Sequence, residues 1–222
     1  MFGTMYGSVI HVPTMGHIGK VKIMELVTIN SETLHTLVKG AIVGASKDKG
    51  LMGLNVVRFE IREPLVRVVS TDRYRLVIGD INMTEGTVME IGNFNLPLES
   101  AKDLLKALPI KKDSGNVLIE LSDDEKYVSF TCEGSAGKWS KEYLTIDSLF
   151  PKYESLIPKQ FTATEDICFN PTFMADIAKL PAAPGAPVRM KFTGNNKPMF
   201  GEIRGASEVE WTYLLMPVRL AG

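Results

Sequence analysis

The sequence predicts an α+β protein in which one unit, a strand followed by a helix and then by three strands, occurs three times. Apolar residues at helical spacing mark three helices, and strand-like apolar runs follow each of them. Pro, Gly or charged corners separate these runs. The unit returns after roughly 60 residues, a longer period than most solenoid repeats have. We therefore expect helices packed on antiparallel sheets.

The first unit shows the pattern most clearly. A strand over residues 24–29 leads to Asn30 or Ser31, either of which can cap a helix that ends at residues 47–50. The apolar positions of that helix are Leu34, Leu37, Val38, Ala41, Ile42 and Ala45. Three strands are then expected over residues 54–61, 65–70 and 74–81, with corners at residues 63–64 and 72–73.

In the other two units, prolines mark the expected start and end of the helix. In the second, a strand over residues 88–94 precedes a helix with Pro97 in its first turn and Pro109 as its stop. Strands follow over residues 117–121, 127–132 and 138–145. In the third, a strand over residues 166–169 precedes Asn170-Pro171, a cap followed by a first-turn proline, and Pro181 ends the helix. Its strands are expected over residues 188–193, 199–203 and 208–216.

Composition limits the class of protein. The chain has 222 residues and a formal net charge of -1, so any contact with nucleic acid must come from a local concentration of Lys and Arg. No run approaches the roughly 18 apolar residues of a membrane span, and the N-terminus does not read as an export signal. We therefore expect a cytoplasmic protein with no membrane association. Cys132 and Cys168 are interpreted as buried free thiols, because their spacing suits neither a metal site nor a disulfide framework.

Four segments carry a family resemblance when taken in order. They are Thr71-Asp72-Arg73-Tyr74-Arg75-Leu76, Phe150-Pro151-Lys152-Tyr153 with Leu156-Ile157-Pro158, Asn170-Pro171-Thr172-Phe173, and Leu215-Met216-Pro217-Val218-Arg219-Leu220. Together they resemble the bacterial sliding clamp, the beta subunit of DNA polymerase III. Residues 24–158 resemble both units of its middle domain, and residues 163–220 resemble the second unit of its last domain. We expect an N-terminal extension over residues 1–23, a two-unit clamp-like domain over residues 24–158, and a third unit over residues 159–222.

The resemblance implies a fold and a role. In the family, a ring of twelve units surrounds duplex DNA, with helices on the inner face and antiparallel sheets on the outer face. It implies a processivity factor without catalysis, cofactor or metal. The partners would be a replicative DNA polymerase, a clamp loader, other proteins with clamp-binding peptides, and double-stranded DNA without sequence specificity. A chain of three units would need four copies to restore twelve, so we expect a homo-oligomer. The alternative is a reduced module that keeps the peptide pocket without encircling DNA.

The resemblance also implies a client-peptide pocket between the second and third units. Its residues would be Leu54, Thr71, Arg73, Tyr74, Arg75, Leu76, Pro151, Tyr153, Leu156, Leu214, Met216, Pro217, Val218 and Arg219. Their chemistry suits the role, because the aliphatic side chains can form an apolar floor and Met216 adapts to several partners. Arg75 and Arg219 can bind peptide carbonyls or an acidic side chain. The alternative is that the aliphatic residues belong to the core, in a closing strand, and that the arginines are solvated.

Contacts with DNA would come from lysines on or after the three helices. The candidates are Lys39, Lys47, Lys49, Lys102, Lys106, Lys111, Lys112 and Lys179. Such phosphate contacts are independent of sequence and sensitive to salt. Because Glu32, Glu99, Asp103 and Asp176 lie on or beside the same helices, solvated faces of mixed charge explain these lysines equally well.

An enzyme is the competing class. His11, His17 and His35 lack metal-ligand spacing, and neither a nucleophile elbow nor a phosphate-binding glycine loop is present. Residues 194–197 are interpreted as a hairpin turn and residues 123–125 as an acidic turn between strands. The sequence therefore favours a binding protein without catalysis of its own.

Overall fold

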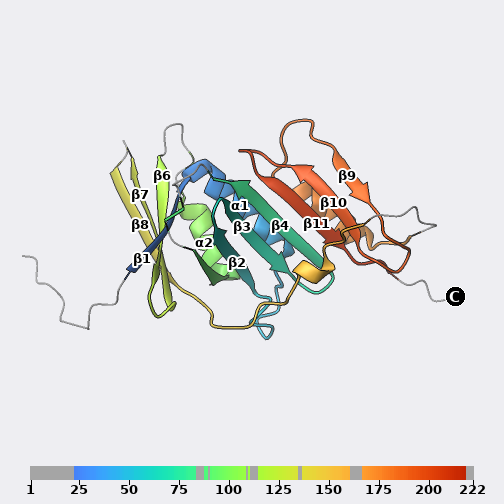
Figure 1. The fold of residues 1–222 in the computed structure, drawn as a ribbon, viewed down its shortest axis with the longest axis horizontal. Coiled ribbons are helices and arrows are strands. Elements are labelled where there is room, and N and C mark those ends of the chain that lie inside the picture. The colour runs from blue at the N-terminus through green and yellow to red at the C-terminus, as the bar shows by residue number, and fades with distance from the viewer. Residues whose placement is uncertain are drawn as a thin grey trace, which may run out of the picture.

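The structure is a computed structural model that describes residues 23–83, 88–89, 91–108, 110, 115–134, 137–160 and 167–218. Within these residues the first two units follow the expected order of strand, helix and strands, and the third has its helix and the strands after it (Figure 1). The expected N-terminal extension lies almost wholly outside the described residues, and so do Pro109, Lys111, Lys112 and Arg219.

The first unit consists of β1 (Ile23–Asn30), α1 (Ser31–Gly44), β2 (Val56–Arg62), β3 (Leu65–Thr71) and β4 (Arg75–Asn82). The side chain of Asn30 accepts hydrogen bonds from the backbone N–H groups of Glu32 and Thr33, at 2.9 and 3.4 Å. Two of the donors that an isolated helix start leaves unpaired are thereby satisfied, so Asn30 is the cap. The expected helix and strands of this unit are confirmed to within a few residues.

The second unit consists of β5 (Gly92–Pro97), α2 (Leu98–Ala107), β6 (Asn116–Ser122), β7 (Tyr127–Gly134) and β8 (Gly137–Leu144). Pro97 is the residue that caps α2 rather than a residue of its first turn. The prediction of a strand over residues 88–94 was wrong in its bounds. Val88 makes only an isolated bridge with Val27, and the strand begins at Gly92 because its ladder with β2 begins there.

The third unit consists of α3 (Pro171–Asp176), the 3-10 turn η2 (Ile177–Lys179), β9 (Val188–Lys191), β10 (Met199–Arg204) and β11 (Glu210–Leu215). Asn170 caps α3 by accepting a hydrogen bond from Thr172 N–H at 2.9 Å, as the Asn-Pro pair predicts. The predicted strand over residues 166–169 does not form in its described part, residues 167–169. The turn at residues 194–197 is confirmed by a backbone hydrogen bond from Lys197 to Gly194.

The strands form two antiparallel sheets, one with the order β1-β6-β7-β8 and one with the order β5-β2-β3-β4-β11-β10-β9. The first strands of the first two units are exchanged, since β1 pairs with β6 of the second unit and β5 pairs with β2 of the first. The third unit joins the first by pairing of β11 with β4. In Figure 1 the four-stranded sheet and β9–β11 lie at opposite ends of the molecule, with α1 and α2 between them.

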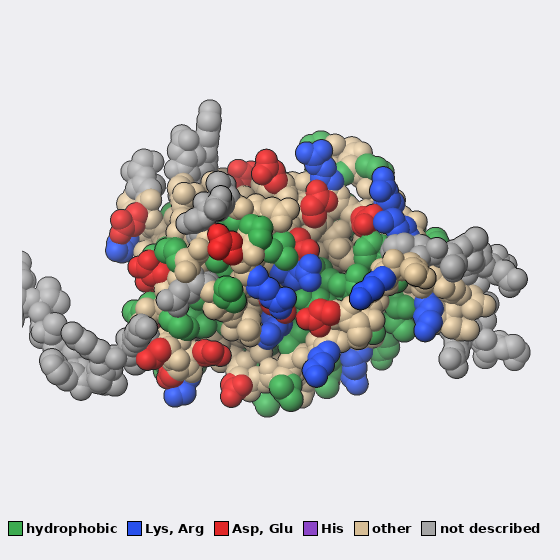
Figure 2. All heavy atoms as spheres, viewed as in Figure 1, with side chains coloured by type: hydrophobic (Ala, Val, Ile, Leu, Met, Phe, Trp, Pro, Cys, Tyr) green, Lys and Arg blue, Asp and Glu red, His purple; other side chains and the backbone are tan. Residues whose placement is uncertain are grey.

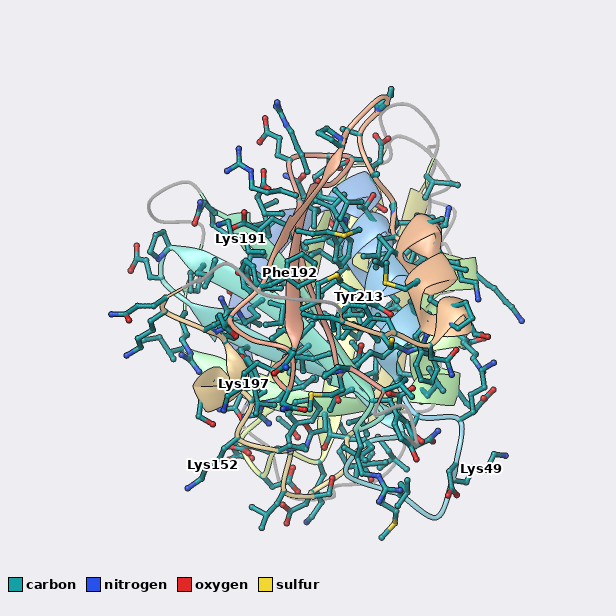
Figure 3. All side chains as sticks on the ribbon, turned by 90° about the vertical axis from the view of Figure 1, so that its right-hand side faces the viewer. Lys49, Lys152, Lys191, Phe192, Lys197 and Tyr213 are labelled. Atoms are coloured by element: carbon teal, nitrogen blue, oxygen red, sulfur yellow. The ribbon has the colours of Figure 1, made fainter. Side chains whose placement is uncertain are left out.

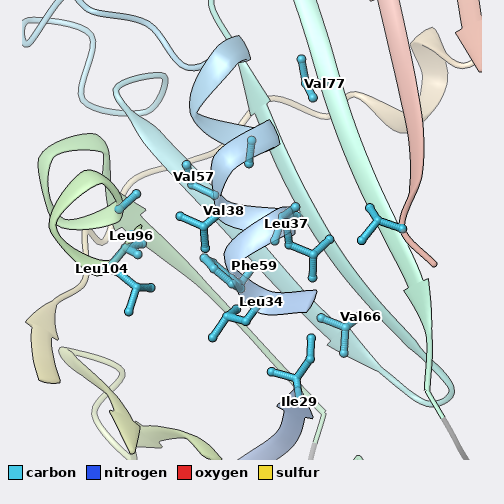
Figure 4. Packing of buried hydrophobic residues seen from close by; sticks show 14 of the residues in the cluster. Ile29, Leu34, Leu37, Val38, Val57, Phe59, Val66, Val77, Leu96 and Leu104 are labelled. Carbon is cyan, nitrogen blue, oxygen red and sulfur yellow. The ribbon is translucent and has the colours of Figure 1, made fainter. Parts of the chain in front are cut away.

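The main core lies between the helices and the inner faces of both sheets. Leu34, Leu37 and Val38 of α1 lie among buried side chains of β2 and β3, including Phe59 (Figure 4). Phe59 stacks on Phe94 of β5 with ring centroids 4.8 Å apart. Because this core uses residues of both units, the two units are expected to fold together.

Trp211 of β11 fastens the third unit to α1. Its ring is 1% exposed, and its Nε1–H donates to the Pro181 carbonyl at 3.1 Å. A Cβ atom on Gly40 of α1 or on Gly79 of β4 would overlap this ring. Glycine at both positions therefore allows the helix and the strand to approach the indole closely. No helix among the described residues is long and apolar enough to cross a membrane.

Candidate functional site

A corner between β3 and β4 presents the first of the predicted site residues. Thr71 Oγ1 donates to the Arg75 carbonyl at 2.7 Å and accepts from Arg73 N–H at 3.2 Å. Asp72 Oδ1 accepts from the N–H groups of Tyr74 and Arg75, both at 3.1 Å. Arg73 has a φ of 79°, in the left-handed region that L-residues seldom occupy. These side-chain bonds hold the corner, which explains why Thr and Asp are needed there.

A second apolar cluster covers the face of the seven-stranded sheet that lies opposite α1, and we call it the outer cluster. It consists of Val69, Leu76, Ile78, Tyr153, Phe200 and Leu214, with Phe150 and Ile157 packed against it. Leu76 of β4 and Leu214 of β11 are direct cross-strand neighbours, each 3% exposed. The strand pairing between the first and third units thus brings two segments 138 positions apart into one apolar surface.

Tyr153 fixes the segment that runs over this cluster. It is 2% exposed, its hydroxyl donates to Glu60 Oε2 at 2.9 Å, and Arg67 Nη1 donates to the hydroxyl at 3.4 Å. Burial raises the pKa of Tyr153 to about 12. Arg67 in turn donates to both carboxylate oxygens of Asp80 at 2.7 Å, and this pairing raises the pKa of the Arg67 guanidinium above its ordinary value. Tyr153 therefore positions the segment instead of offering its ring to solvent.

Several apolar side chains near the outer cluster remain exposed. Leu156, in the 3-10 turn η1 (Glu154–Leu156), is 51% exposed, while Met216 and Val218 after β11 are 43% and 45% exposed. The segment that carries Met216 and Val218 is held by backbone hydrogen bonds from Met216 N–H to the Tyr74 carbonyl and from Val218 N–H to the Cys168 carbonyl. Exposed apolar residues beside a buried floor are typical of a surface that receives an apolar partner. Pro151 and Pro217 flank these positions, exposed and partly buried respectively.

Arg75 lies on the other face of the sheet from Leu76, because successive side chains of a strand point in opposite directions. Its guanidinium pairs with Asp72 and with Asp176 of α3, and it lies 5.0 Å from the centre of the Phe173 ring. The Tyr74 ring stacks on Phe173 with centroids 5.9 Å apart. Arg75 and Tyr74 thus join the β3–β4 corner to the third unit. This arrangement does not favour the predicted hydrogen bonds from Arg75 to a peptide.

Leu54 and Arg219 are the remaining members of the predicted set. Leu54 is 8% exposed in the loop before β2, where its backbone bonds with Leu51 and Ser46. Arg219 lies outside the described residues. The structure therefore brings Leu76, Leu214 and Tyr153 together in one cluster. In the chain, Leu156 is next to Ile157, which packs on that cluster, and Met216 lies two residues after Leu214.

The structure adds residues that the sequence analysis did not single out. Glu60, Arg67, Asp80 and Phe200 complete the support of the outer cluster. The sequence held a signal for Glu60, because this carboxylate interrupts an otherwise apolar strand. In the structure its side chain is only 3% exposed. Arg58 and Arg62 pair with it at 2.9 and 3.0 Å. A cleft of about 510 Å³ opens beside this network and shares Phe150 and Tyr153 with the outer cluster.

The predicted DNA-binding lysines differ in their partners. Lys102 pairs with Glu99 at 2.8 Å, and Lys179 pairs with Asp176. Lys39, Lys47, Lys49 and Lys106 are exposed. A hydrogen bond from Lys102, and the nearby charges of Lys49 and Lys106, lower the pKa of Glu99, so α2 and the loop after α1 bring several cations around one carboxylate. Figure 2 shows acidic and basic side chains intermixed on the face of the molecule that carries η1.

No cluster of three or more His, Cys, Asp or Glu side chains among the described residues could hold a metal ion. His35 lies on α1, and burial together with the Lys39 charge lowers its pKa. Asp124 accepts from Ser122 Oγ at 2.7 Å within the turn between β6 and β7, and this bond lowers its pKa to about 2. Cys132 is buried and outside any disulfide, as expected, whereas Cys168 is outside any disulfide but only partly buried.

Comparisons with known proteins agree with this geometry. A family model described as DNA polymerase III beta subunit, central domain, matches residues 28–152. The beta sliding clamp of Streptomyces coelicolor is 24% identical over 260 positions, covering 88% of this chain and 67% of that protein. The beta subunit structure from Thermotoga maritima has a TM-score of 0.72 at 19% identity, covering 93% of this chain and 68% of that one. The Bacillus subtilis sliding clamp structure has a TM-score of 0.71 at 17% identity, covering 93% of this chain and 67% of that one. These structural likenesses show a shared fold.

Proposed function

Because the chain belongs to the DNA polymerase III beta subunit family, we propose that it is a sliding clamp, a non-catalytic processivity factor of DNA replication. Its partners in this proposal are a replicative polymerase, a clamp loader, other proteins with clamp-binding peptides, and double-stranded DNA. The chain acts as a homo-oligomer.

We place the client-peptide site over the outer cluster, at the junction of β4 and β11. The observation that carries this proposal is the buried cross-strand pair Leu76–Leu214, packed with Tyr153, Phe150 and Ile157. The exposed side chains of Leu156 and Met216 lie one residue from Ile157 and two residues from Leu214 in the chain, respectively. A peptide with two large apolar residues would cover these side chains and remove their apolar surface from water. Thr71, Arg73, Tyr153, Arg67 and Glu60 serve to hold the corner and the segment that form the site.

Calorimetry with a peptide of the Gln-Leu-x-Leu-Phe type tests the site. Burial of two large side chains contributes roughly 1.5–3 kcal/mol each, and ordering the peptide opposes it, so we expect a micromolar Kd. Met216→Glu should abolish binding, because it places a charge beside the apolar floor. Met52→Glu is the matched control, since Met52 is 64% exposed in the loop before β2. Equal affinity for a peptide whose apolar residues are replaced by alanine would overturn the assignment.

We assign the DNA contact to the helices and the loop after α1. Lys39, Lys47, Lys49 and Lys106 are exposed, and Lys102 and Lys179 pair with carboxylates. Lysines of this kind bind phosphates without reading sequence, so the association should fall steeply as salt rises. The alternative function, a module that binds client peptides without encircling DNA, is favoured by the single third unit, whose sheet ends at β9.

A further inference from the structure

The first two units exchange their first strands. The first strand of each unit, β1 or β5, lies at the edge of the other unit's sheet, where it pairs with β6 or β2. In each pairing the residue that caps the helix lies opposite the first residue of the strand it pairs with. These pairs are Asn30 with Asn116, and Pro97 with Val56. The helices α1 and α2 also pack against each other. Each of the two units therefore supplies one strand and receives one.

Among the described residues, the third unit neither supplies a first strand to another unit nor receives one. Its strand β9 pairs with β10 and ends the sheet, so its second edge is open among the described residues. Residues 167–170, which precede α3 as β1 precedes α1, form no ladder. Both halves of the exchange seen in the complete pair are thus missing here.

The sequence before α3 nevertheless carries the same apolar pattern. One and three residues before the helix cap, the first unit has Ile29 and Val27, and the second has Leu96 and Phe94. All four are at most 4% exposed.

The third unit has Phe169 and Ile167 at these positions, and both are only partly buried. The pattern of a first strand is therefore present without the sheet edge that would bury it.

Apolar side chains of α3 and of the edge strand β9 are also less buried than their counterparts in the first two units. Four residues after the cap, Leu34 of α1 and Ala101 of α2 are fully buried, whereas Met174 of α3 is only partly buried. Met190 of β9 is 41% exposed and shares its face of the sheet with Val188, which packs on the main core. Figure 3 looks onto this end of the molecule, where Lys191 and Phe192 are labelled. The Phe169 and Phe192 rings lie with centroids 6.4 Å apart.

We propose that the third unit docks on the third unit of a second copy of this chain, about a two-fold axis. Residues 167–170 of each copy would add to the β9 edge of the other, which reproduces between chains the exchange that β1 and β5 make within one. With a two-fold axis, both copies gain a paired strand, because the same surface of each copy contains residues 167–170 and the β9 edge. A segment of the same chain laid on β9 would leave Phe169 and Ile167 only partly buried, which is why a second copy fits better. This inference rests on the homo-oligomer of the proposed function and names its contact surface, but it does not depend on binding of DNA or of a client peptide.

Light scattering on the full chain, with paired variants, tests the proposal. By analogy with Leu96 and Val57, Phe169 would lie opposite a core-facing residue of β9, directly across from Met190 or one diagonal step away. We expect the intact chain to have at least twice the single-chain mass of 24.5 kDa. Phe169→Glu alone and Met190→Lys alone should each halve the mass of the intact assembly.

Mixing the two variants identifies the contact. A mixed pair contains one Glu–Lys junction and one unsubstituted Phe169–Met190 junction, so an equimolar mixture should regain the mass of the intact assembly. Met52→Glu should leave the mass unchanged. A single-chain mass at every concentration, an unchanged mass in both variants, or a mixture that stays at half mass would each overturn the proposal.

A measurement without substitutions guards against misfolded variants. Hydrogen exchange on the intact chain should show the backbone amides of residues 167–170 and of β9 becoming protected as protein concentration rises, while those of the loop around Met52 do not change. Protection that is independent of concentration across the range in which the mass changes would contradict docking at this edge.

Discussion

The paired units and the lone third unit carry the same pattern of residues but reach different degrees of burial. Ile29 and Leu96 are 2% and 0% exposed, because each lies on a strand that the neighbouring unit's sheet accepts. Phe169 occupies the equivalent place and is only partly buried, and no strand forms around it. The comparison teaches that the first strand of a unit depends on a neighbouring edge. Its own sequence is not sufficient.

The largest expected effect separates these equivalent positions directly. Leu96→Ala should lower the free energy of unfolding by about 2–5 kcal/mol, the usual range for a fully buried leucine. Phe169→Ala removes a larger side chain, yet we expect a loss below about 2 kcal/mol, because Phe169 is only partly buried against the core. Urea unfolding at low protein concentration measures both. The reverse order of effects would show that Phe169 lies in a closed core.

The second test weakens the attachment of the third unit to the first. Gly40→Ala places a methyl group where the Trp211 ring lies, and such overpacking costs about 1–3 kcal/mol. Gly50→Ala is the control, since the nearest atom to its Cβ is an exposed Asp48 oxygen at 3.2 Å. Thermal unfolding should show a clear loss for the first variant and little change for the second. Equal midpoints for the two variants would remove Trp211 as the anchor.

The third test concerns the support of the outer cluster. Tyr153 has a pKa of about 12 in the folded protein against an ordinary value of 10.0, so the folded state retains its proton to higher pH. The stability this provides is complete below pH 10 and is lost as pH rises toward 12. Tyr153→Phe should lower stability by about 1 kcal/mol at pH 7 and flatten the decline above pH 10. Unfolding midpoints from pH 9 to 12 measure this, and identical slopes for both proteins would contradict it.

The smallest expected effect compares two helix caps. Asn30→Ala should cost about 1 kcal/mol, because Asn30 serves two N–H groups at the start of a 14-residue helix. Asn170→Ala should cost less, because the 6-residue α3 is only partly packed. Urea midpoints of the two variants decide the order. A greater loss from Asn170→Ala would mean that α3 is held more firmly than its burial indicates.

Local signals predicted much of this fold. The caps Asn30 and Asn170, the corner at Asp72 and, to within one residue, the helix start at Pro97 follow from backbone chemistry that nearby residues provide. The missing strand at residues 167–169 could not be predicted, because a strand needs an edge that the local sequence does not reveal. The same holds for the candidate site. Its members were identified by family motif, but the burial of Tyr153 depends on Glu60, 93 positions away, and the direction of Arg75 depends on the alternation set by β4.

Retention on DNA of different topology tests the sliding-clamp function most directly. The full chain would be loaded by its clamp loader onto closed circular duplex DNA and onto the same DNA made linear, and then washed at rising salt. A clamp that encircles DNA should stay on the circle at salt concentrations that remove it from the linear molecule, and linearising the loaded circle should release it. Equal retention on both forms, or no retention on either, would contradict the encircling role and leave a module that binds client peptides.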